Sequence, residues 1–233
     1  MNYELDINED FVNIKDLAQF NYKAICLNKD FTFGDKISDH KKIELNCSVY
    51  KKITLYLSEK NKRSTIKLPN HEILCVSCKD GTKPFFDFLC ESYETDIISL
   101  DLHTPLFYFN ESSVRKALRR NIFFEIKMKK ILYNEKCHFL KNTQRFLNLT
   151  KGRNLLFSSN ANVITEIKSM EDILCFLQLF DCKKKWIERI KENKERFLYT
   201  VACKKYLFKD CFGSEVYEGE LKNDFIVKKF EGI

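Results

Sequence analysis

Short runs of hydrophobic residues with the spacing of β-strands alternate along this chain with segments in which hydrophobic residues recur every three or four positions. The first pattern predicts strands and the second predicts amphipathic helices. Several of the runs are apolar over nearly their whole length, which is typical of strands that are buried on both faces. The predicted strands are residues 3–7, 22–28, 52–57, 72–78, 96–102, 122–128 and 154–159.

Helices are predicted between these strands, at residues 9–20, 83–92, 112–120, 134–149 and 170–180, with residues 183–205 helical in two pieces. Repeated βα units favour a parallel sheet, and seven strands suit a barrel. We therefore expect an α/β fold, a TIM-barrel-like β/α barrel over residues 1–209 as a single domain, followed by a C-terminal tail or hairpin over 210–233. The pattern alone also allows a doubly wound open sheet. Weak periodicity over residues 29–51 predicts a long surface loop.

Length and composition agree with one domain, because 233 residues with 44% hydrophobic content suffice for a barrel of about 200–250 residues. The net charge of +7 is unevenly distributed. Residues 111–210 hold 23 lysines and arginines against 11 acidic residues, whereas the rest of the chain holds 17 against 22. A segregated basic half indicates a polyanionic partner, since neutralising phosphates releases counterions. Ordinary solvated lysines are the alternative.

The cysteines and the start of the chain bear on its compartment. Ten cysteines without an apolar amino-terminal signal predict reduced thiols that serve mostly as small buried hydrophobic groups. The first ten residues, MNYELDINED, are acidic and do not resemble a secretory peptide. No apolar run approaches the roughly 18–20 residues that a membrane span requires. We expect a soluble intracellular protein without membrane contact.

The chain lacks the common motifs of nucleotide and acyl chemistry. It contains six glycines and no GxGxxG, GxxxxGK or GxSxG string, so a phosphate-cradling loop or a serine nucleophile elbow is not expected. Cys75 and Cys78 form the only CxxC, and a structural zinc site would need a second pair. We predict that both are buried thiols.

Metal-dependent catalysis would require several ligands converging from many strand ends. The four histidines are His40, His71, His103 and His138, and no HxH pair occurs. Asp101 and His103 end a predicted strand and would point to one face, which a metal site could use. A metal-dependent phosphoesterase built on these two residues is our alternative to a non-catalytic protein.

Basic residues give the stronger signal. The predicted helix at 112–120 has an apolar stripe of Val114, Ala117 and Leu118, with arginines and lysines spaced by four on its other side. Further cations follow the strand at 122–128 and precede the strand at 154–159, so these two groups are expected at opposite ends of a barrel. The candidate phosphate-binding residues are Arg115, Lys116, Arg119, Arg120, Lys127, Lys129, Lys130, Lys151 and Arg153.

Five short sequence segments occur along the chain in a fixed order, and this order is more informative about the family than any single segment. They are PLFYF at 105–109, SSVRKALRRNIFFEIKM ending at Met128, TKGRNLLFSSNA at 150–161, EIKSMEDILCFLQLF at 166–180 and ENKERFL at 192–198. In this order they resemble the thirty-kilodalton protein subunit family of ribonuclease P and ribonuclease MRP, called protein component three in archaea. The amino-terminal half is similar to the same family more loosely.

The resemblance implies a TIM barrel like those of the polymerase and histidinol phosphatase (PHP) family. It implies a non-catalytic, RNA-binding protein subunit of nuclear ribonuclease P, with the nucleolus as a further location, and of ribonuclease MRP. The RNA of such an enzyme, with Mg²⁺ held at the RNA, removes the 5′ leader of precursor tRNA. The implied partners are ribonuclease P RNA, MRP RNA, a small ferredoxin-like protein subunit that covers part of the barrel, and other ribonuclease P proteins.

The chain also departs from the family pattern. Arginines that relatives carry early in the helix before TKGRN correspond here to Cys137 and His138. The arginine of an RGP motif corresponds to Lys168, which keeps the charge needed for RNA binding but loses the planar fork that grips phosphate. Asn193 and Arg196 occupy the expected polar positions near the end of the matching region, where we predict structural hydrogen bonds.

Overall fold

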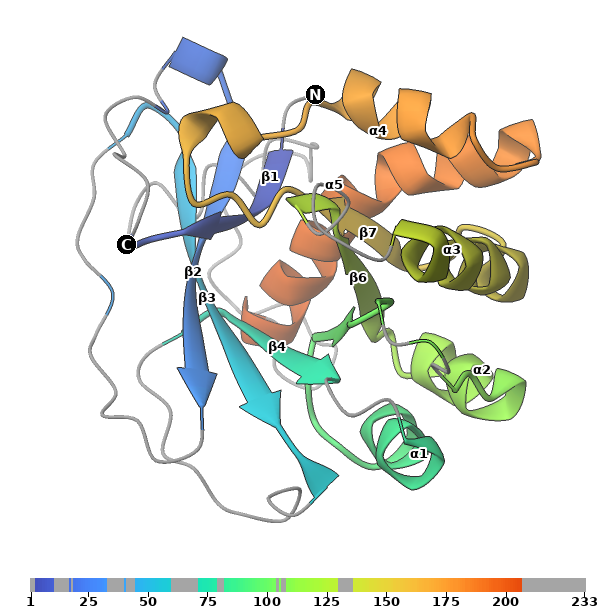
Figure 1. Ribbon diagram of the computed structural model, residues 1–233. Helices are drawn as coiled ribbons and strands as arrows, with labels where there is room; N and C mark the ends of the chain where they lie inside the picture. Colours follow the sequence, from blue (N-terminus) through green and yellow to red (C-terminus); the bar gives the residue numbers. More distant parts are fainter. Residues whose placement is uncertain are drawn as a thin grey trace.

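Seven parallel strands in chain order build the computed structural model of this protein (Figure 1). They are β1 (Tyr3–Asn8), β2 (Ala24–Thr32), β3 (Ser48–Leu57), β4 (Ile73–Cys78), β5 (Ile97–Leu100), β6 (Phe123–Lys127) and β7 (Leu155–Ser158). A bridge between Ile7 and Ala161 joins β1 to the residues after β7, with Asn8 N donating to Ala161 O at 3.1 Å. This bridge brings the two edges together into a nearly closed barrel, so the open-sheet alternative is wrong.

The structure describes residues 3–10, 17, 19–32, 40, 45–59, 71–78, 82–103, 105, 108–129 and 136–206, with side chains to residue 202. The predicted tail at 210–233, and most of the predicted helix at 9–20, lie outside these residues. Within the described part of the chain, no helix has the length and hydrophobicity that crossing a membrane would require.

Four helices cover the outer face of the sheet on one side (Figure 1). They are α1 (Lys83–Glu91), α2 (Glu111–Arg119), α3 (Lys136–Thr150) and α4 (Met170–Leu177), the last preceded by the short 3₁₀ helix η4 (Ile164–Glu166). Their apolar stripes and the outward side chains of the strands form the largest hydrophobic cluster, in which Phe86, Phe124 and Phe146 are fully buried. This packing explains why the strands read as continuous apolar runs.

Two elements are longer than the sequence pattern predicts. The region predicted as a loop at 29–51 is strand at both its ends, because β2 continues to Thr32 and β3 begins at Ser48. The helix predicted in two pieces is one helix, α5 (Lys184–Tyr206), and no proline or glycine interrupts it. In both places tertiary pairing and packing extend an element whose local pattern is weak.

The helix α5 closes one end of the barrel. Its residues Phe197, Leu198 and Val201 complete a second hydrophobic cluster with inward side chains of all seven strands. Lys194 Nζ donates to Tyr3 O at 2.9 Å, and Asn193 Nδ2 donates to the carbonyl oxygens that flank the start of β7. The strand starts therefore lie against α5, and the predicted structural role of Asn193 is confirmed.

A left-handed turn lets α5 approach the barrel. Lys151, Gly152 and Asn154, between α3 and β7, have φ values of 55°, 73° and 49°. A Cβ atom on Gly152 would lie 2.6 Å from the backbone oxygen of Trp186 in the first turns of α5. Only glycine fits here, because a side chain would both strain the turn and push the helix away.

We expect Gly152→Ala to lower the free energy of unfolding by at least about 1–2 kcal/mol, the usual cost of left-handed backbone for an L-residue. The contact with Trp186 adds to this cost. Urea unfolding followed by circular dichroism measures the change. Lys151→Gly, one position away and also at positive φ, is the matched control and should stay within about 1 kcal/mol of the wild type. Equal stability of the wild type and Gly152→Ala would contradict this account of the turn.

Candidate functional site

Four of the buried charged side chains in the described part of the chain lie together inside the barrel, above the apolar layer that α5 closes. They are Asp6, Lys52, Glu125 and Lys127, and none is more than 3% exposed. Lys52 comes two residues after Tyr50 on β3, and Glu125 comes two residues after Phe123 on β6; Tyr50 and Phe123 belong to the apolar layer. Side chains two positions apart on a strand point to the same face. The charged group therefore lies toward the carboxyl ends of the strands, which is where barrel enzymes hold their reactive groups.

The four side chains form a continuous set of ion pairs. Lys52 Nζ lies 2.6 Å from Glu125 Oε1 and 3.3 Å from Asp6 Oδ2. Lys127 Nζ lies 3.1 Å from the same Asp6 oxygen. Lys52 also donates to Leu5 O at 3.1 Å, and Asn160 Nδ2 donates to Asp6 Oδ1 at 3.3 Å. We call these four charged residues the interior ion network.

The directions of the pKa shifts indicate that the network favours its charged forms. Burial alone lowers the pKa of Lys52 and of Lys127, but the nearby carboxylates of Asp6 and Glu125 outweigh it and raise both pKa values above the ordinary value. Burial alone raises the pKa of Asp6, yet Lys127 and Lys52 hold it below the ordinary value. Asp6 and both lysines are therefore charged at neutral pH.

Sequence reasoning missed this network. A backbone irregularity brings Asp6 inward, because the pairing register of β1 shifts between Glu4 and Ile7, and such a bulge re-aims a side chain. The signal that was available is the presence of Lys52, Glu125 and Lys127 inside otherwise apolar strands. Charges at such positions need partners, but only the closed barrel shows which residues meet.

The cations at the carboxyl end of β6 do not form one exposed patch. Lys127 was predicted to contact phosphate at the surface, but it is 3% exposed and bound to Asp6, because its strand points it into the barrel. Lys129 Nζ pairs with Glu166 Oε2 at 2.9 Å, and Lys130 lies outside the described residues. Lys168 is half-buried, and its backbone N donates to Ser159 Oγ at 2.8 Å.

The helix α2 presents most of its predicted cations to solvent. Arg115 and Lys116 are exposed and pair with Glu111 and Glu91, respectively. Arg120, just past the end of α2, differs because its guanidinium donates to Cys90 O at 2.9 Å and to Tyr93 O at 2.7 Å. Arg120 therefore connects the ends of α1 and α2, and its guanidinium is engaged in hydrogen bonds within the protein.

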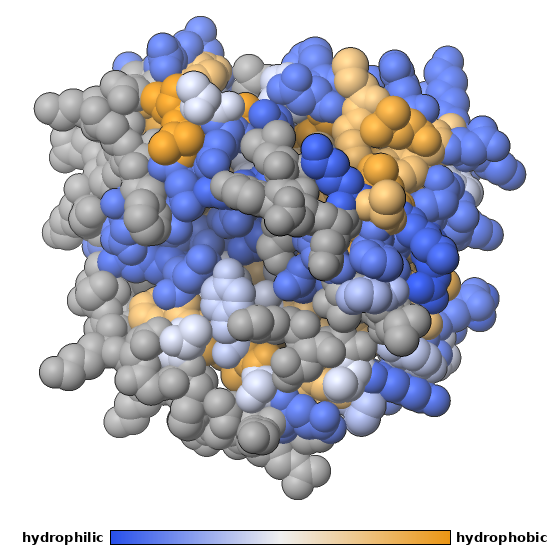
Figure 2. Space-filling view, viewed as in Figure 1, coloured by the Kyte–Doolittle hydropathy of each residue, from blue (hydrophilic) through white to orange (hydrophobic). Residues whose placement is uncertain are grey.

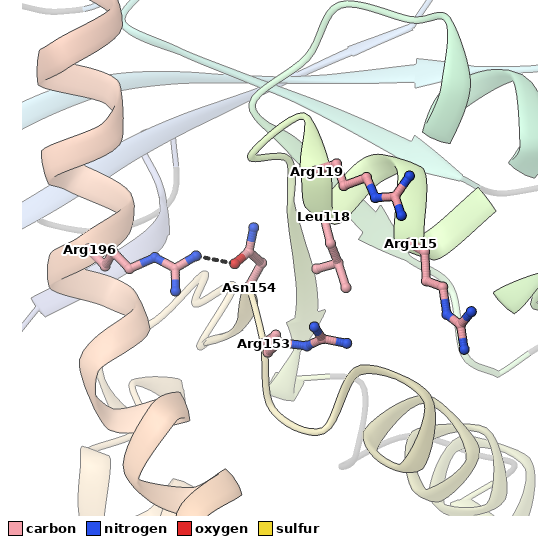
Figure 3. A pocket seen from close by; sticks show the side chains of 6 residues that line it. All are labelled: Arg115, Leu118, Arg119, Arg153, Asn154 and Arg196. Atoms are coloured by element: carbon pink, nitrogen blue, oxygen red, sulfur yellow. Dashed lines mark hydrogen bonds between the residues drawn. The ribbon is translucent and has the colours of Figure 1, made fainter. Parts of the chain in front are cut away.

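A hollow of about 480 Å³ brings together cations from three separate parts of the chain (Figure 3). The C-terminal half of α2 contributes Arg115, Leu118 and Arg119, the turn before β7 contributes Arg153 and Asn154, and α5 contributes Arg196. None of these six lining residues is acidic. We call this hollow the arginine pocket.

Lys151 and Arg153 precede β7 whereas Lys129 follows β6, so the two groups lie at opposite ends of the barrel, as predicted.

Hydrogen bonds hold one side of the arginine pocket in place. Arg196 donates to Asn154 Oδ1 and lies over the ring of Phe123, 5.5 Å from its centroid. Asn154 Nδ2 in turn donates to Ile122 O at 3.1 Å, which fixes the amide. The predicted structural hydrogen bond of Arg196 is therefore confirmed. Its position in the pocket was missed, because α2 and α5 are far apart in the sequence.

On the other side of the pocket, the arginines make fewer interactions within the protein. Arg153 Nε donates to Thr150 O at 3.3 Å, which orients the side chain. In the described part of the chain, neither Arg119 nor Arg153 has a carboxylate within ion-pair distance, and both are exposed. Guanidinium groups in this state attract anions and bind phosphate or carboxylate oxygens in pairs.

The residues considered for metal binding do not converge. The ring of His103 stacks on Phe139 with centroids 5.0 Å apart, and β5 ends before Asp101. Cys75 and Cys78 are buried in β4, as predicted, and burial raises the pKa of the Cys75 thiol to about 12. Across the described ranges, no group of three or more histidines, cysteines and acidic residues could hold a metal ion.

An apolar area covers part of the outer surface around α4 (Figure 2). Leu179, two residues past the end of α4, is 70% exposed, and Cys175 is also exposed. Leu174 and Met170 of the same helix are only partly buried. Exposed apolar area of this kind is typical of surfaces that bind another protein.

Comparisons with known proteins agree with this geometry. The family described as RNase P subunit p30 matches residues 1–205. The chain is 28% identical over 153 residues to Protein GAMETOPHYTE DEFECTIVE 1 of Arabidopsis thaliana, a match that covers 64% of this chain and 26% of that protein. The chain thus spans about a quarter of the length of that relative.

A solved structure shares the fold. One chain of the cryo-EM structure of archaeal ribonuclease P with mature tRNA is similar with a TM-score of 0.66 and 18% identity, covering 95% of this chain and 100% of that one. The structural likeness confirms the predicted barrel class, and the family match extends from the first strand to nearly the end of α5. The chain belongs to the RNase P subunit p30 family.

Proposed function

We propose that the chain acts as a protein subunit of ribonuclease P and contributes RNA binding to that ribonucleoprotein enzyme. The observation that carries the proposal is the family match over residues 1–205, which includes every described strand and nearly all of α5. The arginine pocket and the basic balance of residues 111–210 support a polyanionic partner.

The proposed assembly includes ribonuclease P RNA, further ribonuclease P proteins and precursor tRNA as the substrate from which the 5′ leader is removed. Mg²⁺ would be held at the RNA. A small ferredoxin-like subunit would cover part of the barrel, and the apolar area around α4 has the character of such a contact. We also propose that the chain is a subunit of ribonuclease MRP and that it is located in the nucleus or nucleolus.

The interior ion network supports a non-catalytic protein. A barrel enzyme that uses metal ions needs carboxylates at the carboxyl ends of its strands that are available as ligands. Here Lys52 and Lys127 neutralise Asp6 and Glu125. A divalent cation would have to displace buried ammonium groups, so the RNA is the better candidate for the chemistry.

The proposed RNA-binding surface follows from the exposure of the predicted cations. It comprises two groups at opposite ends of the barrel, each with side chains at least partly accessible to solvent. One group is Lys129 and Lys168, and the other is Arg115, Lys116, Arg119, Lys151 and Arg153. Lys127 and Arg120 are left out, since one is inside the barrel and the other binds backbone carbonyls. Lys130 lies outside the described residues, and its RNA contact stays a prediction.

Purification of the tagged chain from its native cells tests the subunit role. We expect the chain to recover a structured RNA, together with activity that removes the 5′ leader from precursor tRNA. Sequencing of the bound RNA identifies it, and nuclease treatment of the eluate should abolish cleavage if RNA carries the chemistry. Recovery of intact chain with neither RNA nor cleavage would refute the proposal.

Lys52→Met should lower the free energy of unfolding by about 3–5 kcal/mol, because it leaves buried carboxylates with one cation in place of two. Glu111→Gln breaks the exposed pair with Arg115 and is the matched control, with an expected cost below about 0.5 kcal/mol. Urea unfolding measures both. A cost for Lys52→Met as small as that of the control would show that the network is not energetically coupled.

The network also predicts a pH dependence of stability. The folded pKa of Asp6 is lowered, so its contribution is complete above the ordinary pKa of about 3.8 and is lost as pH falls through the folded value. The raised lysine pKa values keep their contributions intact below about pH 10.5. The stability difference between the wild type and Asp6→Asn should therefore be constant from about pH 5 to 9 and shrink below about pH 4. Unfolding curves across this range measure it; a difference that persists unchanged in acid would contradict the assignment.

A further inference from the structure

The arginine pocket holds more positive charge than one phosphodiester can neutralise. Four guanidinium groups line one hollow of about 480 Å³, a volume within the range of about 300–1,000 Å³ that is usual for ligand sites. Each phosphodiester of an RNA strand carries a single negative charge. Arg115 already pairs with Glu111 outside the lining, so Arg119, Arg153 and Arg196 remain without a carboxylate partner in the lining. A matching ligand therefore brings several anionic groups close together.

The lining also indicates which part of a nucleic acid is contacted. Besides the arginines, it contains only Leu118 and Asn154, and Leu118 lies between Arg119 and Arg153 in the close-up (Figure 3). None of the six residues is aromatic, so the pocket offers no aromatic surface on which a base could stack. Contacts to phosphate oxygens position an RNA without reading its sequence.

Preorganisation strengthens the case for a binding site. The hydrogen bonds of Arg196 to Asn154 and of Arg153 to Thr150 hold two guanidinium groups in place before a ligand arrives. Each group keeps further nitrogen donors for a ligand, because a guanidinium has five N–H groups. Like charges held near one another raise the energy of the empty pocket, and a bound polyanion relieves this repulsion.

We propose that the arginine pocket binds a sharp turn in the RNA backbone, where phosphates from successive or crossing segments converge. An extended strand spreads its phosphates along its length and would offer the pocket too few charges. A tight turn crowds phosphates that repel one another, and the arginines of the pocket neutralise them, chiefly Arg119, Arg153 and Arg196, since Arg115 also pairs with Glu111. This inference rests on the proposed function and adds the RNA feature that the site recognises.

Binding measurements with the full-length chain test the inference. Arg119→Gln/Arg153→Gln removes two pocket cations that have no ion pair in the described part of the chain, and Lys83→Gln/Lys141→Gln removes two exposed cations outside the pocket. Fluorescence anisotropy at several salt concentrations, with the RNA recovered from the purified complex and with linear polyuridylate, gives affinity and salt dependence. Urea unfolding verifies that both double variants remain folded.

We expect the pocket variant to bind the structured RNA about 10- to 100-fold more weakly, because two charged hydrogen-bond donors are removed. The slope of log affinity against log salt should fall by about 2, since each arginine that binds a phosphate adds about 1 to it. The control should match the wild type, and polyuridylate should be affected far less. If both RNAs were bound equally more weakly, the pocket would not recognise a backbone turn. Unchanged affinity for the structured RNA would show that the pocket is not an RNA-binding site, while leaving the subunit role intact.

A photo-crosslinking amino acid in place of Arg115 distinguishes RNA from protein as the occupant within the purified complex. Crosslinks to the RNA at one backbone turn are the expected result. Crosslinks to a protein only would show that an acidic protein segment fills the pocket and would overturn the proposal. A wild-type chain that binds no RNA in either assay would instead remove the proposed function as well.

Discussion

The balance of charge inside the barrel is the constraint on which the rest of the structure depends. Two lysines and two acidic residues are buried together, and removing any one of them would leave an uncompensated charge in a medium of low dielectric constant. The network links β1, β3 and β6, strands that are distant in the sequence. The network therefore favours the register of the barrel that brings these groups together.

The interior is layered as a consequence. The helix α5 closes an apolar layer at the strand starts, and the interior ion network lies beyond it toward the strand ends. An end of the barrel that could hold reactive groups is thus occupied by lysine amines, while the outer surface near the strand starts carries the arginine pocket. In this arrangement the inside of the barrel supports the fold, and its outer surface carries the cations proposed to bind RNA.

The arginine pocket shows how one fold can make a binding site from unrelated elements. Gly152 allows α5 to lie against the turn before β7, and this contact brings Arg196 beside Asn154 and Arg153. The helix α2 contributes its C-terminal arginines from the other side. The same turn therefore connects the closure of the barrel with the geometry of the proposed RNA site, although it contributes only two of the lining side chains.

The sequence by itself determined the class of fold, the family resemblance and the basic character of the second half. Hydrophobic periodicity is a local property, so the seven strands and the helices α1 to α4 could be located from it, apart from their ends. Burial of Cys75 and Cys78 and the hydrogen bonds of Asn193 were likewise accessible. Only the tertiary structure decided which cations face solvent, because that depends on barrel closure and on the bulge in β1. The apolar strand around Lys127 shows that this lysine needs a buried partner, but only the closed barrel identifies Asp6 as that partner. Likewise, Arg196 and Arg119 line one pocket only because the fold brings together segments that are far apart in the chain.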